Sequence, residues 1–227
     1  MKAQLTKLVI CPVIIFHFFI QNVQGQSPSS PILLHSPFEP EISLSAGLQR
    51  GWGNGNISNL NNWGVFGIAD FKRYKFQMAV GMTENENFEN TFSFNSGISF
   101  SLASRRGLWT FQPAVFTGFG YTEIYFSTTE NYEMINIPLG LSIGLKGPIP
   151  YVDVNISFAP KLQYRYINLN EGDQILGGGL NISFLLTPTG SCLGLRMGFD
   201  FLKIDDPTQV ENELERSILL GLEYIFY

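Results

Sequence analysis

The sequence predicts an all-β protein, an antiparallel transmembrane β-barrel of about ten strands. Three observations support this prediction. After residue 40 the chain alternates apolar and polar residues with a period of two, and no comparable stretch shows the 3.6-residue period of a helix. The 20 Phe and 9 Tyr favour strands. Short turns and long loops alternate along the chain between these segments, as they do in barrels that cross membranes.

The N-terminal residues 1–25 have the pattern of a signal peptide. Lys2 and Lys7 precede an apolar run, residues 8–20, which small or neutral residues follow at 23–25. A spanning helix needs about 20 apolar residues, so a membrane anchor is the weaker alternative. We therefore expect an exported protein with a Pro/Ser-rich arm at 26–39 and one barrel domain at 40–227.

Ten segments of alternating residues are the predicted strands, and several are long enough to cross a bilayer as tilted strands of about 9–11 residues. They are residues 40–50, 63–72, 74–83, 91–102, 109–123, 132–145, 150–166, 174–186, 192–204 and 217–227. Long polar loops are expected at 51–62, 84–90, 124–131, 167–173 and 205–216.

Periodicity alone does not say which face of the sheet points inward, and a soluble barrel or sandwich is the alternative. The polar face is rich in Gly, Ser, Thr and Asn and carries charges of both signs, as a narrow lumen requires. The apolar face carries aromatic residues near the strand ends, as the interfacial girdles of membrane barrels do: Trp63, Tyr74, Trp109, Tyr121, Tyr151, Tyr166 and Tyr224. We therefore expect the apolar face to contact lipid.

Charged residues on the polar face are the candidate functional residues: Asp70, Lys72, Lys75, Asp153, Lys161, Arg165, Arg196, Asp200 and Glu223. They could form a selectivity ring along a solute path. They could instead form a self-neutralising network, because an unpaired buried charge is costly and narrow barrels are filled by side chains. The second interpretation is favoured. If a path exists, we expect Lys161, Arg165 and Arg196 to contact anions, with Asp153, Asp200 and Glu223 as their partners.

Other classes of function lack the residues they need. Removal of residues 1–25 takes away Lys2 and Lys7 and leaves 12 basic against 19 acidic side chains, which argues against nucleic-acid binding. One histidine, His35, and one cysteine remain, so we expect no catalytic site, no metal site and no cofactor. The acidic residues at 205, 206, 211, 213 and 215 are expected in a solvated loop.

The last strand carries a resemblance. Residues 221–226, Gly-Leu-Glu-Tyr-Ile-Phe, closely resemble the C-terminal assembly signal of Gram-negative outer-membrane barrels, with one further aromatic residue at the end. The resemblance implies outer-membrane placement and recognition by the barrel insertion machinery. The residues concerned are Gly221, Leu222, Tyr224, Phe226 and Tyr227.

A second resemblance covers residues 132–151. This stretch, with Asn-Ile-Pro-Leu at 136–139 and Pro-Tyr-Val at 150–152, is similar to the strand–turn–strand core of the porin-like outer-membrane β-barrel domain family of Bacteroidetes-type bacteria. Members of that family often have eight strands, so eight is the alternative to ten.

These observations predict an integral outer-membrane barrel that is porin-like or structural, passes or binds a small solute, and is not an enzyme. The expected partners are outer-membrane lipid and the insertion machinery, with no nucleic acid and no specified solute. The alternative is a surface-adhesion or envelope-interaction barrel that acts through its extracellular loops. A lipid-modifying barrel enzyme is disfavoured because His35 lies ahead of the first strand.

Overall fold

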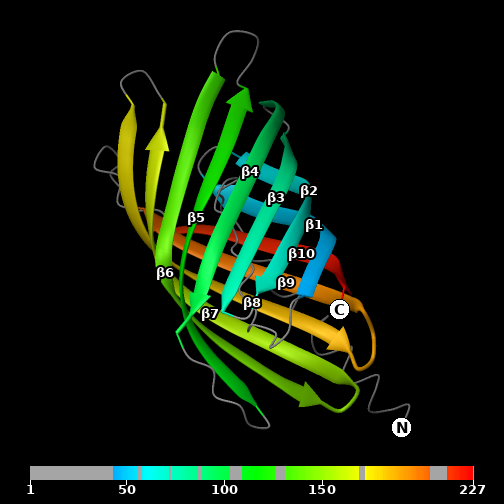
Figure 1. Cartoon of the computed structure of the whole chain (residues 1–227). Coiled ribbons are helices and arrows are strands. Elements are labelled where there is room, and N and C mark those ends of the chain that lie inside the picture. The colour runs from blue at the N-terminus through cyan, green and yellow to red at the C-terminus, as the bar shows by residue number, and fades with distance from the viewer. Residues whose placement is uncertain are drawn as a thin grey trace.

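The protein is a closed barrel of antiparallel strands (Figure 1). The computed structural model describes residues 43–55, 58–71, 73–85, 88–102, 109–125, 131–168, 172–204 and 214–226. These residues form ten strands, which confirms the predicted fold class and strand count. They are β1 (Ser43–Gly55), β2 (Ser58–Phe71), β3 (Tyr74–Asn85), β4 (Phe88–Ser101), β5 (Thr110–Tyr125), β6 (Asn131–Ile149), β7 (Val152–Ile167), β8 (Asp173–Pro188), β9 (Leu193–Ile204) and β10 (Leu214–Phe226).

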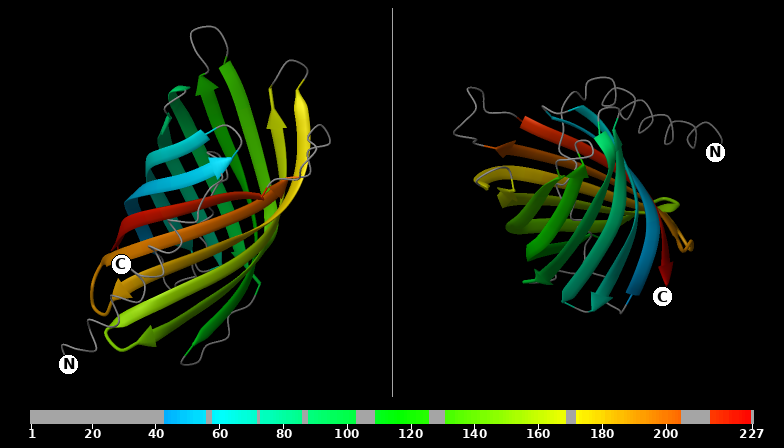
Figure 2. Two further views of the ribbon diagram at one scale, coloured as in Figure 1. Left: turned by 180° about the vertical axis from the view of Figure 1, so that it is seen from behind. Right: turned by 90° about the horizontal axis from the view of Figure 1, so that it is seen from above.

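The first and last strands close the sheet. Each strand pairs with its neighbours in sequence, and β1 also pairs with β10 from Leu44↔Phe226 to Asn54↔Arg216. Figure 2 shows β10 in red beside β1 in blue from two sides. Closure gives every strand two partners, so the described sheet has no unpaired edge.

The strands extend further into the long connections than the sequence predicts. The predicted loop at 51–62 is wrong, because β1 continues to Gly55, β2 begins at Ser58, and these two residues pair. In the same way β4 begins at Phe88 and β10 at Leu214. Beyond the apolar band of the barrel, the hairpins are held together by backbone hydrogen bonds. These bonds do not require an apolar residue at every second position. The alternation therefore stops before the strand does.

Burial is reversed relative to a water-soluble domain. Large apolar side chains cover the outside, including Leu48, Met78, Leu139, Leu162 and Leu222, whereas Ser, Asn, Gln and charged side chains face inward and are buried. A contiguous apolar exterior of this kind fits a lipid environment. Among the described residues, no helix is long and apolar enough to cross a bilayer.

Aromatic residues mark both ends of the apolar band. On β2, Trp63 lies toward the long connections and Phe71 toward the short turns, and Tyr74 follows on β3. The strand from Trp63 to Phe71 rises about 27 Å at 3.4 Å per residue, or roughly 20 Å along the barrel axis at the usual tilt. This height is close to that of the lipid-facing band of known barrels, about 25 Å.

Apolar side chains also support the inside of the wall. Phe66, Ile68 and Leu219 form a buried cluster. The Phe66 ring lies over Gly47 of the next strand, where an added Cβ would lie 2.6 Å from Phe66 Cζ and would collide with the carbonyl oxygen of Leu222. Glycine at position 47 therefore admits both the ring and the neighbouring strand.

Candidate functional site: the interior charge network

A chain of six hydrogen-bonded side chains crosses the interior wall from β6 to β10. We call it the interior network; its members are Asn136, Lys161, Gln163, Arg165, Asp200 and Glu215. It joins β6, β7, β9 and β10, with β8 in between.

Glycines on β8 let the network cross that strand. Lys161 lies opposite Gly179, and Gln163 lies opposite Gly177. A Cβ at Gly179 would collide with the backbone of β9. Because these positions have no side chains, the long side chain of Lys161 can pass over β8 and reach Asp200.

Lys161 and Asp200 form one end of the network. Lys161 Nζ donates to Asp200 Oδ2 at 2.9 Å and to Gln163 Oε1 at 3.0 Å. The Lys161 and Asp200 side chains are each only 1% exposed. A buried ion pair of this kind needs further hydrogen bonds to offset desolvation, and Gln163 supplies one.

Arg165 forms the end of the network nearest the long connections. Its Nη1 and Nη2 donate to the two carboxylate oxygens of Glu215, each at 2.7 Å, and its Nε donates to Asn136 Oδ1 at 3.0 Å. Asn136 Oδ1 also accepts from Gln163 Nε2 at 2.7 Å. The two-point geometry is the strongest arrangement of guanidinium and carboxylate.

Two further ion pairs lie nearer the short turns. Arg196 Nη2 lies 2.6 Å from Glu223 Oε2, and its Nε donates to the same oxygen at 2.7 Å. Lys75 Nζ lies 3.1 Å from Oδ1 of Asp70, its cross-strand partner. Lys75 also interacts electrostatically with Arg196 and Glu223, so the two ion pairs are coupled to each other.

Five of the six expected lumen residues therefore lie in ion pairs: Lys161, Arg165, Arg196, Asp200 and Glu223. Asp153 lies elsewhere, at the other end of β7 from Arg165, opposite Thr187. The carboxylate beside Arg165 belongs to Glu215 instead. Lys72 lies outside the described residues.

Glu215 is the main residue that the sequence analysis misplaced. It does not belong to a solvated loop, because β10 begins at Leu214 and turns Glu215 inward. The signal for this was present, since Glu215 shares its parity with Ser217, Gly221 and Glu223 on the polar face. The other acidic residues of that segment, at 205, 206, 211 and 213, lie outside the described residues, as do the signal-peptide and arm segments and His35.

The expected assembly signal lies on the closing strand. Gly221 is buried on the inner face, whereas Leu222, Tyr224 and Phe226 are exposed on the outer face. The rings of Tyr224 and Phe226 meet with centroids 4.8 Å apart. Tyr227 lies outside the described residues.

The described ion pairs balance each other in charge. Four cations, Lys75, Lys161, Arg165 and Arg196, face four anions, Asp70, Asp200, Glu215 and Glu223. Within the described ranges, no three His, Cys, Asp or Glu side chains come together in a group that could hold a metal ion. These four ion pairs can tie strands together, and each neutralises its own charges.

Comparisons with known proteins add the following. No protein-family model and no curated protein matches the chain. Similar solved structures include the beta domain of the Bordetella autotransporter BrkA, with 8% identity, a TM-score of 0.47 and coverage of 83% of this chain and 100% of that one. The Escherichia coli outer membrane protease OmpT has 8% identity, a TM-score of 0.41 and coverage of 85% and 99%. The translocator domain of the autotransporter NalP from Neisseria meningitidis has 13% identity, a TM-score of 0.40 and coverage of 82% and 89%.

These solved structures are outer-membrane β-barrels. At such identities and TM-scores they carry no argument about what this chain does. The narrower resemblance to a family of Bacteroidetes-type bacteria stays a prediction.

Proposed function

We propose that the protein is an integral outer-membrane β-barrel whose interior is closed to ion flow by paired charges, and that its role is structural. The observation that carries this proposal is the state of the interior ion pairs. Arg196 and Glu223 are 2% and 1% exposed, and Lys161 and Asp200 are 1% exposed each. The charges that would select ions in a pore are here bound to each other and shielded from water.

The membrane part of the proposal is supported by the exterior. The apolar outer face and the aromatic residues at both ends of its band suit a bilayer. The signal-peptide pattern at 1–25 and the C-terminal signal at 221–227 support export and insertion into the outer membrane by the barrel insertion machinery. The proposal includes no enzymatic step.

Solute passage is the porin-like version of this function. It would need an open path beside the pairs Lys161–Asp200 and Arg196–Glu223, yet their side chains are at most 2% exposed. The closed barrel is therefore the better supported version.

Single-channel recording in a planar bilayer tests the proposal. The purified protein, checked for folding by heat-modifiable migration, is expected to insert without discrete openings, and a known open porin in the same membrane provides the positive control. Stable discrete openings would refute closure. In that case a change of ion selectivity in Arg165→Gln and Arg196→Gln variants would assign the path to these charges.

A further inference from the structure

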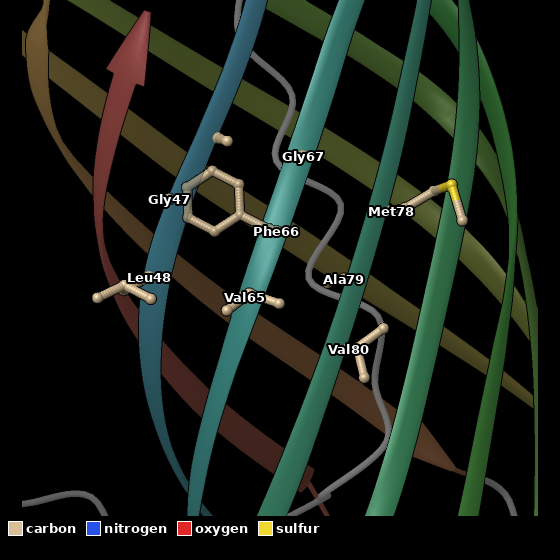
Figure 3. Close-up of a pocket in the computed structure, with 9 residues that line it drawn as sticks. Gly47, Leu48, Val65, Phe66, Gly67, Met78, Ala79 and Val80 are labelled. Atoms are coloured by element: carbon tan, nitrogen blue, oxygen red, sulfur yellow. The ribbon is translucent and has the colours of Figure 1, made fainter.

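An apolar groove of about 540 Å³ lies on the outer face of the barrel across β1, β2 and β3 (Figure 3). Its floor is formed where Ala46 pairs with Gly67. Leu48, Val65 and Val80 form the next row of paired residues, and Met78 lies beside Gly67. The groove is thus a strip of small residues between larger apolar side chains on the lipid-facing surface.

The glycine in the floor is not required by the backbone or by packing. Gly67 does not have a positive φ, and an added Cβ would meet only the carbonyl oxygen of Ser45, at 3.9 Å. A strand favours larger side chains at such an outward-facing position. Glycine within a strand often marks the close approach of another molecule. Gly67 therefore keeps open a space that a side chain could have filled.

A cation lies directly beyond the groove. Arg50 and Trp63 form the next outward-facing cross-strand pair after Leu48 and Val65, about 7 Å further toward the long connections. The guanidinium carbon of Arg50 lies 4.2 Å from the centroid of a Trp63 ring. Tryptophan is enriched at the headgroup level of membranes, and a guanidinium group matches the geometry of a phosphate.

We propose that this groove binds one acyl chain of an anionic phosphate-bearing lipid, with the lipid phosphate on Arg50. The proposal goes beyond a structural role, and it rests on the membrane placement proposed above. The groove is apolar along its length, which suits an acyl chain, and Arg50 at one end supplies a cation for the lipid phosphate. A flat protein partner would not need a narrow floor of small residues with a cation at one end.

Native mass spectrometry of the detergent-solubilised protein measures this binding. Phosphatidylglycerol is titrated against diacylglycerol with the same acyl chains and against inorganic phosphate alone. Loss of a charge-assisted hydrogen bond should weaken diacylglycerol binding by about tenfold or more. Inorganic phosphate alone should not be retained, because it lacks the acyl chain. Equal retention of diacylglycerol and phosphatidylglycerol would overturn the proposal.

Two variants test the two ends of the site. Gly67→Leu fills the groove and Arg50→Gln removes the cation, so each should lose most of the bound phosphatidylglycerol. Gly178→Leu is the matched control, because Gly178 is an exposed strand glycine outside the groove and an added Cβ there has no atom within 4 Å. All variants are first checked for heat-modifiable folding. Equal lipid retention by Gly67→Leu and Gly178→Leu would refute the site, whereas a folded barrel that does not enter vesicles would refute the proposed membrane function instead.

Discussion

The ammonium group of Lys161 on β7 and the carboxylate of Asp200 on β9 meet at 2.9 Å across a strand that lies between them. The contact is possible because β8 carries Gly179 opposite Lys161. The pair therefore links two strands that share no backbone hydrogen bonds.

Removal of one member of this pair should be more damaging than removal of both. Lys161→Met leaves the carboxylate of Asp200 buried without this counter-charge, and we expect a loss of about 3–5 kcal/mol in the free energy of unfolding. The double variant Lys161→Met/Asp200→Leu should recover much of that loss. Urea titrations of the protein in lipid vesicles measure both. If the double variant is no more stable than the single one, the two charges do not act as a pair.

Two glycines on strands should respond differently to the same substitution. Gly47→Ala places a Cβ against the Phe66 ring and the β10 backbone, so we expect a loss of about 1–3 kcal/mol from overpacking. Gly178→Ala points into open space and should change stability by less than about 0.5 kcal/mol. The same unfolding titrations compare them. Equal losses would contradict the packing of Phe66 over Gly47.

The membrane placement predicts the depth of two tryptophans. Trp63 and Trp109 are exposed on the outer surface, Trp63 toward the long connections and Trp109 just before β5 at the turn end. Variants that keep only one of them, with the other tryptophans changed to Phe, should be quenched more by lipids brominated near the headgroup than near the chain ends. Fluorescence in brominated vesicles checks this. A tryptophan that no brominated lipid quenches would place its girdle outside the bilayer.

The C-terminal residues should matter more for assembly in cells than for stability. Deletion of residues 226 and 227 removes a single described register pair of the β1–β10 seam, Leu44↔Phe226, so refolding in detergent should be nearly unchanged. Insertion in cells should fall strongly, because the deletion removes the terminal aromatic residues of the proposed assembly signal. Fractionation of outer membranes measures the effect, with Leu162→Ala as control, because Leu162 is an exposed outer-face leucine on β7 outside the signal. Normal insertion of the deleted chain would contradict the signal.

The strand pattern could be predicted where one face contacts lipid and the other faces the interior. In β6, the outward residues Ile135, Ile137 and Leu139 alternate with inward Asn136 and Gly140. The predicted strand, 132–145, lies within the observed one, which continues to Ile149. The segment Ser58–Asn62 lies beyond the apolar band and has little apolar alternation, so its sequence predicts a loop. This segment is a strand because its backbone pairs with β1, and the order of apolar and polar residues does not reveal that pairing.

The site could be predicted only in part, for a related reason. The parity of Lys161, Arg196, Asp200 and Glu223 placed them on the polar face, but their contacts depend on the register between strands. The pairing of Arg165 with Glu215 joins residues on β7 and β10, which are not neighbours in the sheet. The groove at Gly67 was missed because its signal is an unfilled space, which appears only once the strands lie side by side.

The pairing of β1 with β10 also means that the barrel closes last, after the other strands have paired. The partner of β1 on this side is the last strand of the sheet, so a chain in which β10 has not yet paired can hold every earlier hairpin and still be an open sheet. Until β10 arrives, the free edges of β1 and β9 offer unpaired backbone groups to any other strand nearby. Each newly made molecule therefore passes through an interval in which it must be kept apart from its own copies.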